Sequence, residues 1–222
     1  MSVSHRPSDP TVALVRACRW RFASEPARAA ALRDISRQAS HPVIELFEDV
    51  EQPALLALSW GGEPEPDPMS APWPPALNAD AEVEWVADAQ VIARWRAPAG
   101  NDPGCLVVVR QPLVRPDHGA QRDWASTVLR ALDGDPTPPA GLLTASFFAS
   151  RDGSFVLNFA EWSSPAAHRE ALARGSYGRH GSIGSSELWR ATREHSAITS
   201  DHEVHRYVAC MRGSRPESGE AA

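Results

Sequence analysis

The feature that most constrains the fold of this chain is a pattern of strand-like and helix-like segments that occurs twice. Short runs rich in apolar and β-branched residues predict strands, and apolar residues three or four positions apart predict helices. In the first half the predicted strands are 12–22, 43–47, 54–60 and 81–96, with one helix at 23–38. In the second half they are 105–114, 141–150, 154–162 and 201–211, with helices at 117–132, 166–174 and 187–192. Each half therefore has the order β-α-β-β-(α)-β of a ferredoxin-like unit.

A ferredoxin-like unit covers one face of its sheet with helices and leaves the other face bare. Two such units can bury their bare faces against each other and enclose a barrel, so a chain with two copies can build the barrel by itself. We therefore predict an α+β fold in which two tandem ferredoxin-like repeats form an intramolecular dimeric α+β barrel. The predicted repeats are residues 11–98 and 99–212, between disordered termini at 1–10 and 213–222.

The composition excludes several classes of function. A net charge of −6 argues against a nucleic-acid partner. All 22 basic residues are Arg, and without Lys the chain can form neither a Schiff base nor a Walker-type phosphate loop. The three Cys residues are too scattered for a disulfide framework or a thiolate metal site, and the spacing of the His residues predicts no metal site either. No secretory signal and no apolar run of membrane-spanning length is visible, so we expect a cytoplasmic protein without a membrane partner.

The predicted strand SFVLNFAEW, residues 154–162, holds a polar residue in its interior. Side chains alternate across a strand. One face carries Val156, Asn158, Ala160 and Trp162, and the other carries Phe155, Leu157 and Phe159. We expect the mixed first face to be the wall of a cavity and the apolar second face to lie beneath the helices. Asn158 and Trp162 are roughly 13 Å apart along the strand, which suits a flat ligand of three or four fused rings. Alternatively, Asn158 caps a bulge and Trp162 is part of the core.

The stretch from Gly141 to Leu172, GLLTASFFASRDGSFVLNFAEWSSPAAHREAL, resembles the signature of the antibiotic-biosynthesis monooxygenase family. The shared elements are a strand that begins with Gly, an S-x-D-G hairpin turn, an N-[YF]-A-x-W strand and an S-x-x-A helix. The resemblance implies a dimeric α+β barrel that oxidises anthrones and related phenols to quinones. It also implies that the oxidant is O2 and that neither metal nor flavin is needed.

The resemblance also assigns residues to the site. It implies that Asn158 and Trp162 act on the substrate, and it puts His168 where the family commonly has a Tyr, so His168 becomes a candidate general base. The family's active-site Arg lies in an E-L-R context, which in this chain is Glu187-Leu-Trp-Arg190, one position longer. The predicted substrate-binding residues are Val156, Ala160, Thr144, Ser146, Phe148 and Arg190. Weaker candidates are His195, His202 and Tyr207, because the sequence does not fix which face of the last strand looks inward.

The two halves are not equivalent in sequence. Aligning ALLALSW of the first half with FVLNFAEW of the second pairs Trp60 with Trp162 and puts Leu56 in the place of Asn158. The Pro-rich run 63–68 cannot propagate a second helix in the first half. We therefore predict one working cavity, in the second half, and a degenerate one filled by Leu56, Leu58 and nearby Trp side chains. If both cavities are filled, the protein is instead structural or binds without catalysis.

These observations together predict a cofactor-independent monooxygenase that oxidises a polycyclic phenol or anthrone-like polyketide intermediate, with O2 as co-substrate. One alternative uses the same pocket with reduced flavin for hydroxylation or ring cleavage. Another is a non-catalytic protein that binds aromatic polyketides, and a third is a haem-degrading enzyme with an axial His. The association of two chains into a homodimer is left open by the sequence.

Overall fold

The computed structural model describes residues 7–37, 44–60, 73–74, 77, 81–98, 102–135, 139–174, 184 and 186–211. The strands are β1 (Leu14–Phe22), β2 (Ile44–Asp49), β3 (Ala54–Trp60), β4 (Ala81–Arg96), β5 (Cys105–Pro112), β6 (Leu142–Ser150), β7 (Phe155–Trp162) and β8 (Glu203–Met211). The helices are α1 (Glu25–Arg37), α3 (His118–Gly134), α4 (Pro165–Arg174) and α5 (Glu187–Arg193). Every one of these elements begins and ends within two residues of its predicted bounds.

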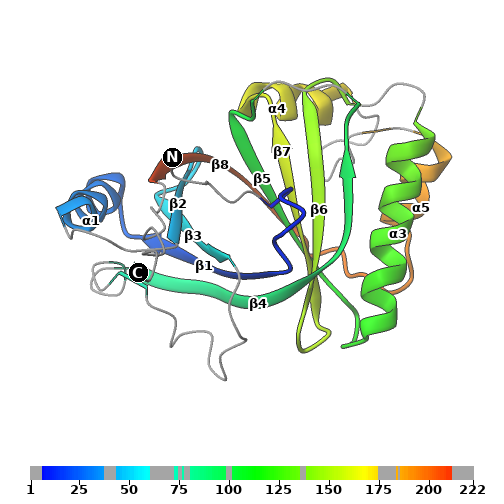
Figure 1. The fold of residues 1–222 in the computed structure, drawn as a ribbon, viewed down its shortest axis with the longest axis horizontal. Coiled ribbons are helices and arrows are strands. Elements are labelled where there is room, and N and C mark those ends of the chain that lie inside the picture. The colour runs from blue at the N-terminus through cyan, green and yellow to red at the C-terminus, as the bar shows by residue number, and fades with distance from the viewer. Residues whose placement is uncertain are drawn as a thin grey trace, which may run out of the picture.

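The eight strands of the described residues form a closed antiparallel barrel in the order β1-β3-β2-β8-β5-β7-β6-β4. Each half of the chain supplies four adjacent strands, and in each the first strand lies between the fourth and the third. The halves join where β2 pairs with β8 and where the long strand β4 pairs with β6 (Figure 1). This topology confirms the predicted fold of two ferredoxin-like repeats that close one barrel.

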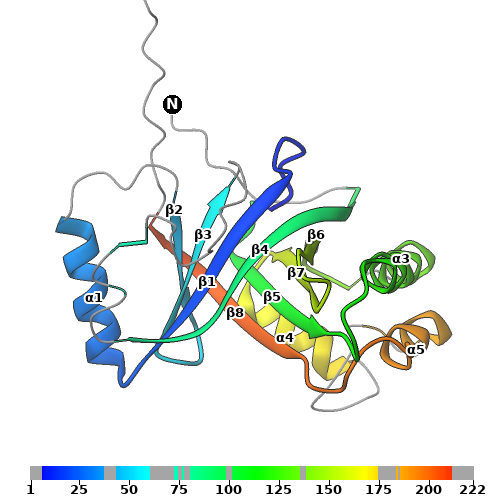
Figure 2. The ribbon, with the colours of Figure 1, turned by 90° about the horizontal axis from the view of Figure 1, so that it is seen from below.

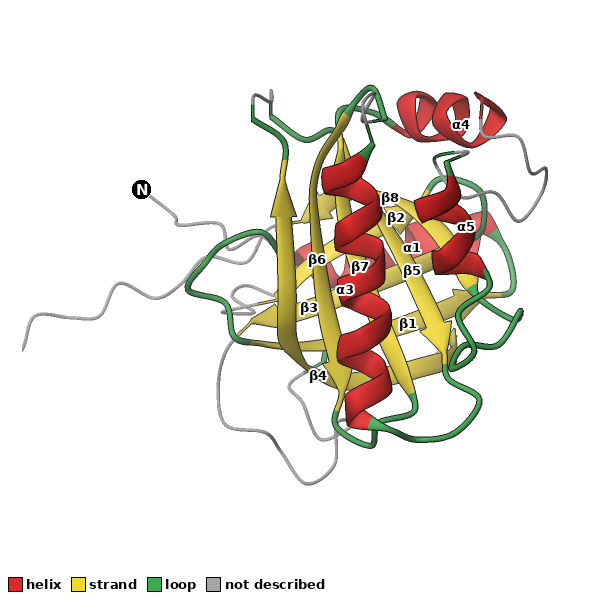
Figure 3. Cartoon of the chain, turned by 90° about the vertical axis from the view of Figure 1, so that its right-hand side faces the viewer, coloured by secondary structure: helices red, strands yellow, loops and turns green. Residues whose placement is uncertain are grey.

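The helices cover the outside of the barrel on opposite sides. Figure 2 shows α1 against the strands of the first half and α3 and α5 beyond the strands of the second half. In Figure 3 α3 and α5 lie side by side over this second sheet, and α4 crosses one end of it. Helix α3 begins at Asp117, whose carboxylate accepts the backbone N–H groups of Gly119 and Ala120 at 2.8 and 3.0 Å.

The interior of the barrel is an apolar core to which both halves contribute. Phe155, Leu157 and Phe159 of β7 point into it. The prediction that these three residues lie beneath the helices is therefore wrong. In this fold the helices lie outside the barrel, so the side of β7 that faces them is the one that carries Ala160 and Trp162.

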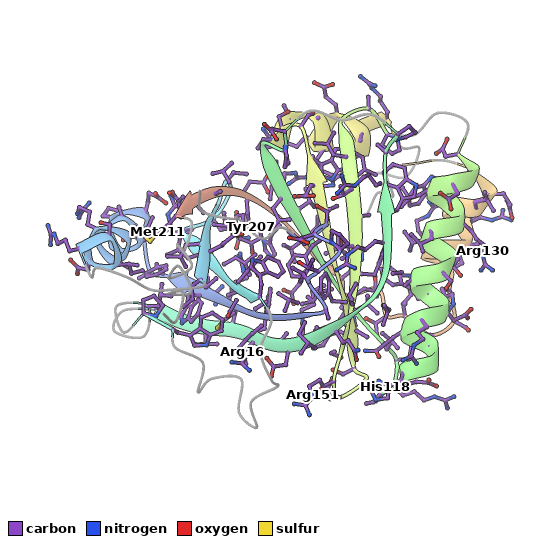
Figure 4. All side chains as sticks on the ribbon, viewed as in Figure 1. Arg16, His118, Arg130, Arg151, Tyr207 and Met211 are labelled. Atoms are coloured by element: carbon purple, nitrogen blue, oxygen red, sulfur yellow. The ribbon has the colours of Figure 1, made fainter. Side chains whose placement is uncertain are left out.

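A group of polar side chains also lies inside the barrel, around the fully buried Arg19 of β1. Its guanidinium donates to Asp49 of β2 at 2.9 Å and also bonds Glu84 of β4 and the Tyr207 hydroxyl of β8. His205 Nδ1 lies 3.1 Å from the same Asp49 carboxylate. Figure 4 shows Tyr207 between the two halves of the molecule. Arg19 thus links strands of both halves across the barrel.

Two glycines of the motif have conformations that require glycine. Gly153 closes the β6–β7 hairpin with a φ of 77°, and Gly141 precedes β6 with a φ of 89°. A Cβ atom on Gly141 would lie 2.6 Å from Ser163 Oγ and 2.7 Å from the Ala167 Cβ. Gly141 therefore allows the start of α4 to pack directly against the start of β6.

Beneath α1, on the corresponding face of the first half, large side chains pack together. Trp20, Leu55 and Trp73 pack there with Ile35 of α1, and the two indole rings are 5.3 Å apart. The sequence predicted that the first-half cavity is filled, but by other residues. Leu56, Leu58 and Trp60, which were expected to fill it, point into the barrel instead. The alignment of Trp60 with Trp162 was therefore displaced by one residue, which reverses the face of the sheet.

Several predicted segments fall outside the described residues. They include most of the Pro-rich stretch 61–75, the termini 1–6 and 212–222, and the loop around residue 181. Pro7, which belongs to the segment expected to be disordered, is buried, and its carbonyl accepts from Arg94 Nε at 3.4 Å. Across the described residues no helix is long and apolar enough to span a membrane. The predicted boundary between the repeats, at residue 98, stays a prediction.

Candidate functional site

A cavity of about 590 Å³ lies between the outer face of the second-half sheet and its helices. Its floor comes from β5, β6, β7 and β8, and α3 and α5 form the roof that Figure 3 shows over these strands. Helix α4 contributes His168 and Leu172 at one end. The described lining residues all lie between Val107 and Val204, so the part of the cavity that the structure describes comes from the second half of the chain.

The cavity exists because small side chains occupy the middle of the floor. Val107, Ala160 and Ala145 are neighbours on three adjacent strands, and all three point toward the helices. The roof above them is aromatic, with Trp124 of α3 and Trp189 of α5. Both indole N–H groups of the roof are already bonded, to Thr192 O at 3.3 Å and to Asp135 Oδ2 at 2.9 Å. The roof therefore offers apolar ring surface to a ligand.

Two aromatic side chains meet at the end of the cavity beneath α4. The Trp162 indole is 1% exposed, and its ring centroid lies 4.8 Å from that of His168 in an edge-on arrangement. Trp162 Nε1 is buried and has no hydrogen-bond partner among the described residues. A buried N–H without a partner is costly to the folded state. An acceptor atom that reached Nε1 would therefore supply a hydrogen bond that the described residues do not supply.

The protonation state of His168 follows from its surroundings. Arg206 Nε of β8 donates to His168 Nδ1 at 2.9 Å. Burial, and after it the charges of Arg206 and Arg169, lower the pKa of His168 from its ordinary value of 6.5 to about 3. The imidazole is therefore neutral, with its lone pair on Nδ1 and its proton on Nε2. With Nδ1 bonded to Arg206, His168 can donate a hydrogen bond from Nε2, and its role as general base stays a prediction.

Further polar groups lie along the floor and at the opposite end. Asn158 Oδ1 is buried without a partner among the described residues. Beyond it Gln111 uses its amide to bond the carbonyl of Thr199 at 2.9 Å. Ser200 and Asp201 line the cavity and are exposed to solvent, so the cavity opens to the surface at this segment. A ligand therefore meets separate polar groups along one apolar slot.

The structure gathers some of the predicted site residues and separates others. Asn158, Ala160, Trp162 and His168 line one cavity, and so does His202. Val156 faces the same way but is packed in the core beside α3. The roles of these residues in binding or catalysis stay predictions.

Besides Val156, four more of the predicted substrate-binding residues do not line the cavity. Thr144, Ser146 and Phe148 pair with Glu161, Phe159 and Leu157, and so share the barrel face of the sheet. The cavity face of β6 carries Ala145 instead. Arg190 is half exposed on α5, where it pairs with glutamates of its own helix. Of the weaker candidates, Tyr207 lies in the barrel and His195 contacts Asp123 at 3.1 Å.

Several residues that shape the site were not predicted from the sequence. Arg206, which bonds His168, is buried although it is charged, and Arg193 lines the cavity where Arg190 was expected. The roof residues Trp124 and Trp189 were predicted only as parts of helices. The sequence does not reveal which face of β8 looks toward the helices. In the structure Val204 and Arg206 lie on the helix side and Tyr207 lies on the barrel side.

Solved structures with this fold include proteins described as oxygenases. An anthrone oxidase-like protein matches over 100% of both chains with a TM-score of 0.67 and 13% identity. The chain shares the fold of that protein. A candidate monooxygenase of Lactobacillus acidophilus NCFM covers 91% of this chain and 97% of its own, with a TM-score of 0.54 and 8% identity. Another, of Fusobacterium nucleatum subsp. nucleatum ATCC 25586, covers 92% and 95%, with a TM-score of 0.50 and 8% identity. No protein-family description and no curated protein matches the sequence.

The low pKa of His168 predicts a pH dependence of stability. Between about pH 3 and pH 6.5 the unfolded chain binds a proton at this residue and the folded chain does not. The free energy of unfolding therefore rises with pH through this window and is lowered by acid. We expect His168→Gln, which can still accept from Arg206, to lose less stability than the wild type between pH 7 and pH 5, by about 1–2 kcal/mol. Urea unfolding at the two pH values measures the difference, and parallel losses in both proteins would contradict the assignment.

Proposed function

We propose that this chain is an O2-dependent monooxygenase that oxidises a polycyclic phenol or anthrone-like aromatic to a quinone without a bound cofactor. The observation that carries the proposal is the unpartnered indole N–H of Trp162, buried beside the neutral donor His168 at the end of an apolar cavity. The fold shared with an anthrone oxidase-like protein supports it. A phenol deprotonated in the site would carry its negative charge on an oxygen that these two donors can bond.

The cavity suits a flat aromatic substrate. Its volume of about 590 Å³ lies within the range of small-molecule sites in proteins. The fused rings would lie between the small residues of the floor, such as Ala160 and Ala145, and the indole surfaces of the roof. Asn158 would bond a hydroxyl or carbonyl group along the edge of the rings. Such contacts fix the ring plane and point one oxygen at Trp162.

The two N–H donors favour the ionised form of the substrate. A donor aimed at an oxygen on which charge develops stabilises that charge most strongly in a site from which water is excluded. Trp162 Nε1 and His168 Nε2 both carry hydrogens, and neither can accept a proton from the substrate. The proton is therefore released to solvent through the opening at Ser200 and Asp201, and the protein lowers the cost of its release.

The reaction balances without an added reductant. Loss of a proton from the reacting CH2 or phenol gives an anion that passes one electron to O2, forming a substrate radical and superoxide. Their recombination forms a C–O bond and, after protonation, a hydroperoxide. Elimination of water across the O–O bond, with loss of the second hydrogen on that carbon, leaves the C=O group of the quinone. One oxygen atom of O2 enters the product and the other becomes water, and the substrate supplies all the electrons.

Isotopic oxygen tests the proposed chemistry. With an anthrone as substrate and ¹⁸O2 as the only labelled species, we expect one ¹⁸O atom in each quinone and the second in water. Mass spectrometry of the quinone measures the incorporation. Activity that appears only after reduced flavin is added would favour the flavin-assisted alternative. Tight binding of the anthrone without oxygen consumption would favour a binding protein, and a Soret band on titration with haem would favour haem degradation.

A further inference from the structure

We propose that Glu51 and Arg206 are positioning residues that hold His168 as an Nε2–H donor, so that the first half of the chain helps to build the site of the second. Glu51 lies in the turn between β2 and β3, and the described residues that line the cavity include none from the first half. The consequence for catalysis rests on the proposed function. The state of the imidazole ring does not, and can be measured separately.

The contacts form a continuous path from the turn to the cavity. Arg206 Nη1 donates to both carboxylate oxygens of Glu51, at 2.8 and 2.9 Å, and Arg206 Nε donates to His168 Nδ1 at 2.9 Å. The backbone adds a further bond, from Val50 N to Arg206 O at 2.9 Å. His168 in turn packs edge-on against Trp162. The path therefore connects a carboxylate of the first half with both donors of the cavity.

Arg206 determines which ring nitrogen of His168 carries the proton. A guanidinium has only donors and stays charged at all physiological pH values. The nitrogen that it contacts, Nδ1, must therefore offer a lone pair, and a neutral imidazole then carries its hydrogen on Nε2. Arg206 and Arg169 are the charged groups that act directly on His168, and both disfavour the imidazolium. In the other tautomer the Nδ1 hydrogen would point at the Arg206 donor and the cavity would lose one of its two donors.

Glu51 is needed because Arg206 is buried. Arg206 is 8% exposed, and a buried cation without a partner is costly to the folded state. Glu51 supplies the opposite charge, and its own turn is fixed by Asp49, whose Oδ1 accepts the backbone N–H groups of Glu51 and Gln52 at 2.8 and 3.1 Å. Asp49 is the same residue that Arg19 holds inside the barrel. The polar core of the barrel thus places the turn that places Arg206.

The test is the tautomer of His168, read from the ¹⁵N chemical shifts and couplings of its ring by NMR. In the wild type we expect a single neutral species with hydrogen on Nε2 and no titration between about pH 5 and pH 8. In Arg206→Met the donor to Nδ1 is lost, and we expect the second tautomer to become populated and the pKa of His168 to rise. Glu51→Gln, which keeps the shape of the side chain, should show the same change to a smaller extent. With an anthrone and O2, kcat should fall about 10- to 100-fold in Arg206→Met, and KM should change less.

Arg110→Met is the matched control. Arg110 is also paired with a carboxylate of β8, Glu203 at 2.8 Å, but it lies over the Phe155 ring on the barrel side. This variant should leave the tautomer of His168 unchanged. A wild type with hydrogen on Nδ1, or an Arg206→Met protein in which His168 keeps only the Nε2–H form, would overturn the proposal. If the ring behaves as expected but no oxygen is consumed by any protein, the proposed function fails and the positioning role stands.

Discussion

Trp162→Phe is expected to lower kcat for oxidation of an anthrone by about 100- to 1,000-fold. The substitution keeps an aromatic ring at the end of the cavity and removes the one N–H group of the indole. Because Trp162 Nε1 has no partner among the described residues, its only hydrogen bond would be made with the substrate, and most strongly when the substrate oxygen is charged. Steady-state oxygen consumption at saturating anthrone measures the loss. KM should change much less than kcat, because the ring surface of the cavity end is retained.

Trp189→Phe separates this donor effect from the general effect of losing an indole. Trp189 lines the same cavity, but its Nε1 already donates to Asp135. We expect Trp189→Phe to raise KM, because ring area in contact with the substrate is lost. It should lower kcat far less than Trp162→Phe does. Equal losses of kcat in the two variants would show that the Trp162 N–H has no special part in the reaction.

The largest loss of stability is expected from Arg19→Met. Arg19 and Asp49 are both fully buried and 2.9 Å apart, so the substitution leaves a carboxylate inside the barrel without its main counter-charge. Removing one partner of a buried ion pair typically lowers the free energy of unfolding by about 3–5 kcal/mol. His205 and two backbone N–H groups still bond Asp49, so we expect a value near the lower end. Urea unfolding followed by circular dichroism at neutral pH measures the change.

Arg21→Met provides the control from the same strand. Arg21 is paired with Glu82 and Glu84, but its side chain is 50% exposed, and exposed ion pairs contribute little. We expect a change of at most about 0.5 kcal/mol. A similar loss in both variants would mean that the barrel network around Arg19 does not hold the two halves together.

Acid should weaken this network. Burial alone would raise the pKa of Asp49, but hydrogen bonds from His205, the Glu51 backbone and Arg19 hold it below the ordinary value of 3.8. A carboxyl group with a lowered pKa in the folded state stabilises the protein fully above its unfolded pKa. That stabilisation is lost as the pH falls toward the folded pKa. The acid loss from Asp49 therefore lies below about pH 4, at and beneath the lower end of the window in which His168 acts.

The sequence predicted the order and the limits of the elements well. Strand and helix periods are properties of local sequence, and turn residues such as Gly153 and the helix cap Asp117 mark the ends sharply. Because this order of elements occurs twice, it predicted two ferredoxin-like sheets that close into one barrel. A cavity does lie in the second half, where it was expected because Asn158 replaces the aligned Leu56 of the first half.

The sequence could not predict which side chains of a strand face the helices and which face the interior of the barrel. Most of the wrong predictions concern this assignment. In a barrel covered by helices both faces of a strand are buried, so polarity does not distinguish them: seven of the eight residues of β7 are buried. An alignment displaced by one residue then reverses every assignment, as it did for Trp60. Thr144, Ser146 and Phe148 were likewise assigned to the wrong face of β6. Arg206 was not predicted as part of the site, because its burial depends on Glu51, 155 residues earlier in the chain.

The most direct test of the proposed function is oxygen uptake by metal-stripped protein given an anthrone and no added reductant. We expect the wild type to consume one O2 per quinone formed. The variant that combines Asn158→Ala with Trp162→Phe should show only the rate of the reaction without protein. The variant must also unfold cooperatively at the same urea concentration as the wild type, so that loss of folding is excluded. A wild type that consumes no more O2 than the reaction without protein, with or without reduced flavin, would contradict the account and leave a binding protein.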